Sequence, residues 1–206
     1  MRRTILGLLL LQLSLGAAIR ARADADPKLA ADSPKAALKA QDAAARSGDI
    51  DADIQFYQAE GEQQKKLVQV IAAGDVAVSK LEKAVAERFG KDLATATVRA
   101  AGTVDAQAID AATENVDGDH ATVRFADQST PVPMVRSDGK WKVSISEWTK
   151  GASSHDLDVL TSKLDELATQ INQVTDLVSH DKFRSGEGVR DRIQELHDRL
   201  FGSRVK

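Results

Sequence analysis

The sequence has no cysteine and few aromatic residues, and both shortages limit the sites that it can build. Without cysteine, the chain forms no disulfide, no thiolate nucleophile and no thiolate metal site. Its 206 residues include two Trp, five Phe and a single tyrosine, Tyr57. Small residues, above all Ala, make up much of the apolar set, and this composition favours helices.

Long apolar runs are absent after the first residues, which have the three parts of a secretory signal peptide. Arg2 and Arg3 provide the positive charge. Residues 5–15 are apolar but too short to cross a bilayer, and Ala21-Arg22-Ala23 fits a small-x-small cleavage site. The alternative is an uncleaved amphipathic or anchoring helix. We expect cleavage after residue 23, a periplasmic or secreted protein, and no integral membrane segment in the mature chain.

The net charge becomes more negative once the signal peptide is removed. The full chain has 28 Lys and Arg against 31 Asp and Glu, a net charge of −3. Residues 1–23 contain four arginines and no acid, so 24 basic residues remain against 31 acidic ones and the net charge becomes −7. Such an acidic exported protein is a poor candidate for binding nucleic acid or anionic lipid headgroups.

Apolar residues alternate with polar ones only between residues 109 and 148, where we expect four short strands. Trp141, Val143 and Ile145 have the period of two that is typical of a strand with one buried face. Asp117-Gly118 and Asp138-Gly139 are typical of two-residue hairpin turns. Pro133 cannot donate to a ladder hydrogen bond, which predicts an edge strand or a bulge. The pattern predicts an antiparallel meander whose apolar face is covered by helices.

Helical periodicity dominates on both sides of this sheet. Ser33-Pro34 is typical of a helix start, and Gly48 is typical of a helix end. Asp49 or Asp51 then caps a second helix, which we expect to include Tyr57.

The acidic residues at the start of this second helix allow two interpretations. Asp49, Asp51 and Asp53, followed by Glu60 at the twelfth position, have the spacing of a calcium loop. The sixth position of such a loop requires glycine for its sharp turn, but Ile54 occupies it. The missing glycine favours helix capping, with acidic residues at the positive end of the helix dipole.

Two motifs in residues 33–148 resemble the SnoaL-like proteins of the nuclear transport factor 2-like superfamily. The first is a helix followed by Arg46-Ser47-Gly48-Asp49-Ile50-Asp51-Ala52 and Phe56-Tyr57, and the second is Asp138-Gly139-Lys140-Trp141-Lys142-Val143. The resemblance implies a curved antiparallel sheet that wraps around helices to form a cone with a pocket. Members of the superfamily usually have a β-hairpin between their second and third helices. Residues 60–102 are helical here, interrupted at Gly74-Asp75, so we expect a reduced sheet with extra helix packed on it.

After a short linker at residues 150–154, an apolar stripe recurs at steps of three and four over three heptads. Its members are Leu157, Leu160, Leu164, Leu167, Ile171, Val174 and Val178. A shorter stripe follows the break at Ser185-Gly186-Glu187-Gly188 and comprises Val189, Ile193, Leu196 and Leu200. The two helices can form a hairpin that rests on the domain's own core, or the first can pair with a second chain as a coiled coil. We expect the hairpin and a monomer, with a homodimer as the alternative.

Few residues point to catalysis, and we assign no catalytic residue. The four histidines, His120, His155, His180 and His197, are scattered without ligand spacing on one helix, so we expect no metal site and no cofactor. Some SnoaL-like relatives are isomerases, cyclases or dehydratases that use a pocket carboxylate or histidine. That resemblance makes Tyr57, Asp110, His120 and Trp141 the candidate pocket residues. His120 lies on the polar face of its strand and Trp141 on the apolar face, which favours a solvent-exposed histidine and a core tryptophan.

The sequence thus predicts an α+β protein with N-terminal helices, a four-stranded antiparallel meander and a C-terminal helical hairpin. Its expected parts are a signal peptide at 1–23, a flexible lead-in at 24–32, an α+β domain at 33–149 and a helical extension at 150–206. We expect a non-catalytic exported domain that binds a small apolar ligand or a protein partner. The alternatives are a SnoaL-like enzyme with a pocket acid–base group, and a scaffold that oligomerises through the C-terminal stripe.

Overall fold

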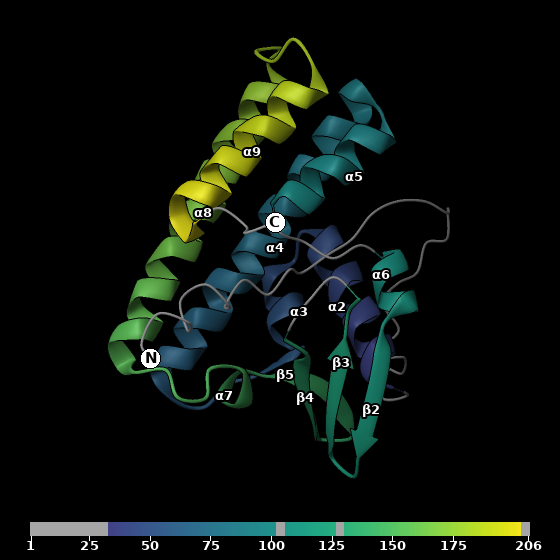
Figure 1. Cartoon of the computed structure of the whole chain (residues 1–206), viewed down its shortest axis with the longest axis vertical. Helices are drawn as coiled ribbons and strands as arrows, with labels where there is room; N and C mark the ends of the chain where they lie inside the picture. The colour runs from purple at the N-terminus through teal and green to yellow at the C-terminus, as the bar shows by residue number, and fades with distance from the viewer. Residues whose placement is uncertain (1–32, 102–105, 127–129, 203–206) are drawn as a thin grey trace.

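A computed structural model describes residues 33–101, 106–126 and 130–202 of the chain (Figure 1). The predicted signal peptide and the lead-in at 24–32 lie outside these described residues. The helices are α2 (Pro34–Ser47), α3 (Ile50–Ile54), α4 (Gly61–Phe89), α5 (Lys91–Ala100), α6 (Ala106–Ala111), α7 (Ile145–Trp148), α8 (Ser154–Ser179) and α9 (Gly186–Phe201). The strands are β1 (Tyr57–Gln58), β2 (Thr113–Asp117), β3 (His120–Arg124), β4 (Val132–Ser137) and β5 (Lys140–Ser144). The α+β class is therefore confirmed.

The sheet has five strands, in the order β1-β5-β4-β3-β2, so the predicted four-stranded antiparallel meander is wrong in strand number and in being purely antiparallel. Strands β2 to β5 pair antiparallel, whereas β1 pairs parallel with β5 through Tyr57 and Val143. The Val143 N–H donates to the Phe56 carbonyl at 2.9 Å. A strand of two residues is too short to show an alternating pattern, and its pairing partner lies far along the chain. For the same reason Tyr57 was expected in a helix.

Pro133 lies in a central strand, so the expected edge position is wrong. The Arg136 N–H donates to the Asp119 carbonyl on the β3 side. Because donors alternate along a strand, position 133 faces β5 instead. The ladder between β4 and β5 stops at the pair Met134–Val143, and β5 leaves the sheet after Ser144. The missing N–H of Pro133 therefore falls where no ladder bond is required.

The end of β5 also differs from the alternating pattern. Ser144 caps the short helix α7, and its side chain accepts from the Glu147 N–H at 3.3 Å. Ile145 begins this helix and is nevertheless fully buried. The apolar side chain of Ile145 correctly predicts a buried position, but it does not distinguish a strand from a helix.

The N-terminal helices begin and end where the sequence predicts. The Ser33 side chain caps α2, Pro34 is its first residue, and Gly48 follows it in the left-handed conformation with φ of 81°. The Asp49 side chain accepts from the Ala52 N–H at 3.0 Å and caps α3. Capping, and not a calcium loop, is thus the role of Asp49. Helix α4 continues through Gly74-Asp75 without a break, so the expected interruption there is wrong.

Two apolar cores lie along the length of the molecule (Figure 1). The sheet core joins the apolar face of the sheet to α2, the first half of α4 and the start of α8, and includes Leu38, Leu67, Ile71, Val123, Met134, Trp141, Val143 and Leu160. The helical core joins the second half of α4 to α5, α8 and α9, and includes Leu81, Val85, Val98, Ile171, Val174, Val189, Ile193 and Leu196. The long helices α4 and α8 pack along each other and contribute to both cores.

The C-terminal stripe is covered by the chain itself. Six of its seven members are buried, and Leu164 is half-buried against the sheet core. Helix α8 packs mainly on α4, while α9 packs on α5 as well as on α8. No helix among the described residues is long and apolar enough to span a membrane.

Candidate functional site

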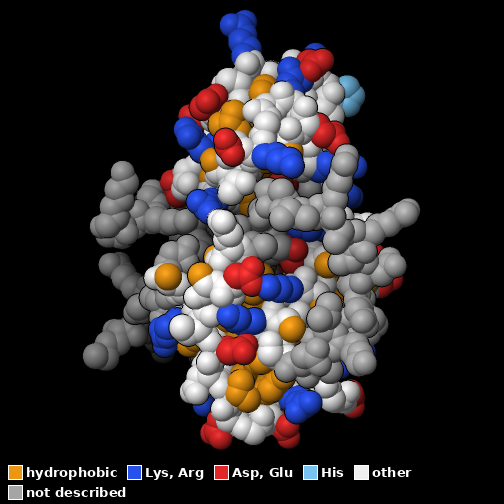
Figure 2. Space-filling model, turned by 90° about the vertical axis from the view of Figure 1, so that its right-hand side faces the viewer, with side chains coloured by type: hydrophobic (Ala, Val, Ile, Leu, Met, Phe, Trp, Pro, Cys, Tyr) orange, Lys and Arg blue, Asp and Glu red, His pale blue; other side chains and the backbone are white. Residues whose placement is uncertain are grey.

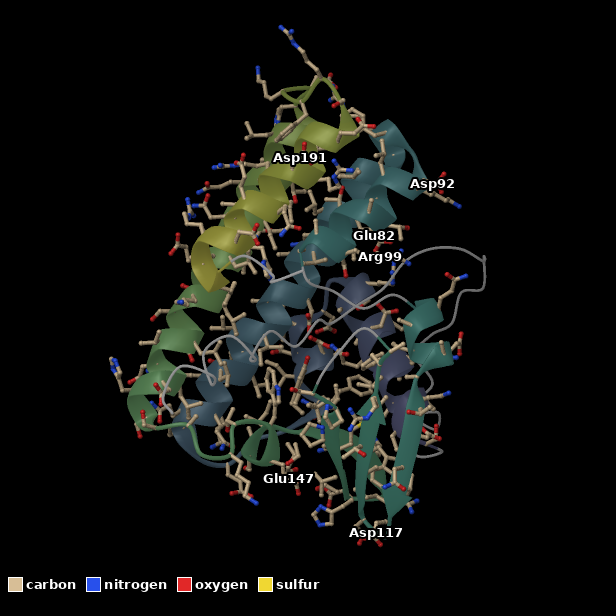
Figure 3. The ribbon with its side chains drawn as sticks, viewed as in Figure 1. Glu82, Asp92, Arg99, Asp117, Glu147 and Asp191 are labelled. Atoms are coloured by element: carbon tan, nitrogen blue, oxygen red, sulfur yellow. The ribbon has the colours of Figure 1, made fainter. Side chains whose placement is uncertain are left out.

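The four candidate pocket residues do not meet at one place. Asp110 is exposed and forms an ion pair with Lys39. His120 is also exposed, and its Nδ1 lies 3.0 Å from a carboxylate oxygen of Glu147 at the lower end of the molecule (Figure 3). Trp141 is buried in the sheet core, as its alternation predicts. Tyr57 alone lies in a polar cluster.

Tyr57 belongs to a buried network that connects α2, α3, β1 and α4. Its hydroxyl donates to Oδ2 of Asp75 at 3.0 Å. The Nε2 of Gln41 lies 2.9 Å from Oδ1 of Asp53, 3.0 Å from Oδ2 of Asp75 and 3.1 Å from the Tyr57 hydroxyl. All four side chains are buried, so the cluster places two carboxyl groups out of contact with water.

These two carboxyl groups influence each other's pKa. Oδ2 of Asp53 has no hydrogen-bond partner among the described residues. A proton on Asp75 favours a hydrogen bond between the two groups, which lowers the pKa of Asp53 and raises that of Asp75. Burial raises the pKa of Asp75 well above its usual value, and the nearby charge of Asp53 raises it further. Burial also raises the pKa of Asp53 to about 7, although the bonds from Gln41 and Asp75 oppose the shift. The fold therefore favours the protonated, neutral form of Asp75.

Three of these residues were not recognised as site residues from sequence. The sequence pattern assigns Asp53 to the acids of a helix start and Asp75 to a break in the helix. The sequence does indicate that Asp75 is buried, because it lies four residues after Ile71 and three before Val78, on the apolar stripe of its helix. Gln41 lies between alanines on the buried face of α2. Polar residues at core positions indicate a paired polar cluster.

A second set of charged side chains extends this network between α2 and α4. The Arg46 Nε lies 3.0 and 3.2 Å from the two carboxylate oxygens of Asp42, one turn earlier on α2. The Arg46 Nη1 lies 3.0 Å from Oε2 of Glu82 on α4. Burial raises the pKa of Asp42 to about 7 in spite of Arg46, and burial likewise raises the pKa of Glu82. We call this set, Asp42, Arg46 and Glu82, the arginine clamp.

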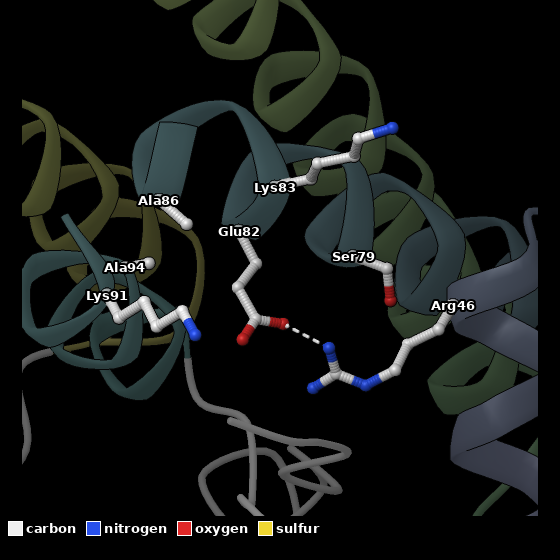
Figure 4. A pocket seen from close by; sticks show the side chains of 7 residues that line it. All are labelled: Arg46, Ser79, Glu82, Lys83, Ala86, Lys91 and Ala94. Carbon is white, nitrogen blue, oxygen red and sulfur yellow. Dashed lines mark ion pairs between the residues drawn. The ribbon is translucent and has the colours of Figure 1, made fainter. Parts of the chain in front are cut away.

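The arginine clamp opens into a pocket of about 270 Å³ between α2, α4 and α5. Its lining residues are Arg46, Ser79, Glu82, Lys83, Ala86, Lys91 and Ala94 (Figure 4). Lysines 83 and 91 have no ion-pair partner among the described residues. Figure 3 places Glu82 between the sheet and the end of the molecule formed by α5 and α9. The pocket thus lies near the middle of the molecule, and its lining has three cationic groups and one carboxylate.

The first turn of α5 forms one wall of this pocket. Lys91 and Ala94 come from that turn, and Gly90 precedes it without a side-chain cap. Uncapped N–H groups and the dipole at a helix start favour negative charge. The wall therefore adds to the positive character of the pocket.

Within the described residues, no group of three or more His, Asp or Glu side chains has the arrangement of a metal site. Comparison with protein-family models, with curated proteins and with solved structures gives no match. The pocket and the acid pair are therefore interpreted from their geometry.

Proposed function

We propose that this protein is an exported, non-catalytic binding domain and that the pocket between α2, α4 and α5 is its ligand site. The observation that carries the proposal is the contrast between this open pocket and the filled face of the sheet. Tyr57, Leu67, Val123 and Trp141 all belong to one buried core. The cone pocket implied by the SnoaL-like resemblance is thus occupied by the chain's own side chains, which leaves little room there for an apolar ligand.

The second described pocket is a weaker candidate. It is lined by residues 47–51 only, the turn between α2 and α3. A ligand there would contact one short segment, whereas the pocket at the arginine clamp draws its lining from three helices. Sites that bury much of a ligand are concave and are built from several elements.

Binding at this pocket is tested with a plug variant and a matched control. Ser79→Trp places a large ring in the pocket, and Lys80→Trp places the same ring on the exposed side of α4. A small-molecule library screened by amide chemical shifts should perturb the lining residues in the wild type and in Lys80→Trp, but not in Ser79→Trp. Ligand shifts that persist in a folded Ser79→Trp protein would remove the pocket from consideration.

An enzyme remains the second candidate, and the Asp53–Asp75 pair favours it. A neutral acid beside a tyrosine hydroxyl is a hydrogen-bond donor set that acid–base enzymes use. Neither described pocket is lined by Asp53, Tyr57 or Asp75. In the same screen, a ligand that perturbs Tyr57 and Asp53 and loses its effect in Asp53→Asn would favour the enzyme.

Export is tested separately on protein from its native host. Residues 1–23 have the charge, apolar segment and cleavage site of a signal peptide. The intact mass should correspond to a chain that begins at Asp24 or within a few residues of it. A mature protein that retains residues 1–15 would contradict export by cleavage.

A further inference from the structure

We propose that the pocket binds a small oxyanion through Arg46 and Lys91, and that acidification strengthens binding by releasing Arg46 from Asp42 and Glu82. The inference rests on the proposed function, because it assigns a ligand class and a control mechanism to the same pocket.

The charge of the lining selects an anion. Arg46 and Lys91 approach the Glu82 carboxylate from two sides, whereas the Lys83 ammonium points away from it (Figure 4). The uncapped first turn of α5 lies beside Lys91. Ser79 adds a hydroxyl that can donate to an oxygen of the ligand. Guanidinium and ammonium groups around a helix start are the donors that phosphate, sulfate and carboxylate groups require.

The size of the pocket limits the ligand. A volume of about 270 Å³ is below the range of roughly 300–1,000 Å³ for sites that hold drug-sized molecules. It fits one tetrahedral oxyanion with its bound water, or a small carboxylic acid. A nucleotide or a lipid would extend beyond it.

Arg46 controls access to the anion because its guanidinium is shared. Its Nε is held by Asp42 and its Nη1 by Glu82, at distances of 3.0 to 3.2 Å. The carboxyl groups of Asp53 from α3 and Asp75 from α4 interact electrostatically with Asp42. Lys83 from α4 and Lys91 from α5 also line the pocket with Glu82. An anion must therefore compete with Asp42 and Glu82 for the same donors.

Protonation removes that competition. Burial raises the pKa of Asp42 to about 7 and raises the pKa of Glu82. As the pH falls, Asp42 takes up a proton near pH 7, and Glu82 does so at a higher pH than an exposed glutamate would; each carboxyl then loses its charge. The pocket becomes more positive, and the fork of Arg46 becomes available to a bidentate oxyanion.

Sulfate is the probe, because its charge is constant between pH 5.5 and 7.5. Amide chemical shifts are followed during titration with sulfate at both values, with sodium chloride added to keep the ionic strength equal. We expect saturable shifts in α2, α4 and α5 around the pocket, with affinity about tenfold higher at pH 5.5 because competing charges are removed within contact distance. A parallel titration with citrate distinguishes a carboxylate ligand from a tetrahedral oxyanion.

Three variants complete the test. Glu82→Gln should bind sulfate at pH 7.5 more tightly than the wild type does and should respond less to pH. Lys91→Gln should weaken binding, whereas Lys80→Gln, the same charge change on the exposed side of α4, should leave it nearly unchanged. Equal losses in the two lysine variants would mean general charge attraction and would contradict a pocket site.

The outcomes separate this inference from the proposed function. If sulfate and citrate fail to bind at either pH while uncharged library members still perturb the pocket, the anion assignment is wrong and the ligand site stands. If nothing binds at the pocket, both proposals fail. If sulfate binds with the same affinity at both pH values, the anion site stands and only the proposed release of Arg46 by acid is wrong.

Discussion

Asp75 shows how a single buried acid makes the stability of this protein depend on pH. An unfolded aspartate releases its proton near pH 4, whereas burial raises the pKa of Asp75 well above that value and the pKa of Asp53 to about 7. Between these values the folded state binds more protons than the unfolded state. The free energy of unfolding must therefore fall as the pH rises from 4 towards 8. Asp42 acts in the same direction.

The first prediction concerns Asp75→Asn. The amide keeps an oxygen for Tyr57 and Gln41 and donates an N–H to Asp53, so it imitates the protonated acid without its dependence on pH. The variant should match the wild type near pH 4 and have the higher free energy of unfolding at pH 8, because only the wild type then loses the proton that burial of Asp75 favours. Urea unfolding across this range measures the difference.

Asp110→Asn is the matched control, because Asp110 is exposed and pairs only at the surface with Lys39. It should change the free energy of unfolding little at every pH. If Asp75→Asn instead lowers the free energy of unfolding by the same amount at pH 8 as at pH 4, protonation of Asp75 does not stabilise the folded network.

The second prediction concerns a close contact at the start of α9. A Cβ atom at Gly186 would lie 2.6 Å from Cδ1 of Leu93 and 3.0 Å from Cβ of Phe89. Gly186→Ala should therefore lower the free energy of unfolding by about 1–3 kcal/mol, the usual cost of overpacking.

Gly188 offers a control two residues away. A Cβ there would meet nothing closer than 3.7 Å, so Gly188→Ala should be neutral or stabilising by up to about 1 kcal/mol through helix propensity. Similar urea midpoints for the two variants would show that α9 does not pack on the corner between α4 and α5.

At the scale of elements, the apolar stripe of α8 is divided between the two cores. Leu157 and Leu160 belong to the sheet core, and Leu167, Ile171 and Val178 belong to the helical core. One helix thus connects the sheet to the C-terminal hairpin. Helix α4 does the same on the other side, and its polar residues Asp75 and Glu82 face α2.

The third prediction compares two positions on this stripe. Ile171 is 1% exposed and Leu164 is only half-buried, so Ile171→Asp should lower the melting temperature more than Leu164→Asp does. A buried carboxylate without a partner is costly, whereas an exposed one is not. Thermal unfolding of each variant and of the double variant measures the order. Equal small losses would contradict the packing of α8 on α4.

The sequence was informative wherever one local pattern determined the structure. The caps at Ser33 and Gly48, the hairpin turns and the burial of Trp141 each depend on residues that lie close together in the chain. Strand β1 and the position of Pro133 were missed because they depend on which distant strand lies alongside. The acid pair joins Asp53 to Asp75 through Gln41, so only the packing of three helices reveals it.

At the scale of the whole molecule, a polar seam lies between α2 and α4. The acid pair occupies its buried part, and the arginine clamp connects it to the open pocket. Among the described side chains, both charge signs are interspersed over the face seen in Figure 2. A face with mixed charges does not attract charged partners non-specifically. Specific binding therefore depends on a defined site such as the pocket.

The covered stripe of α8 also predicts the oligomeric state. Since its apolar residues are buried within one chain, the wild type should be a monomer in light scattering at all concentrations tested. A dimer that forms with rising concentration and that Leu164→Asp with Ile171→Asp converts into folded monomers would favour the scaffold instead.

The most direct test of the central claim is the titration of Glu82 with and without sulfate, followed by the ¹³C shift of its carboxyl carbon. If anion and proton act on the same Arg46, each must strengthen the binding of the other by an equal factor. A tenfold effect corresponds to a rise of about one pKa unit summed over Asp42 and Glu82 when sulfate saturates the pocket, so the pKa of Glu82 should rise by part of this. The exposed carboxyl of Glu147 should not respond. A pKa of Glu82 that stays the same, or that falls on addition of sulfate, would contradict the account.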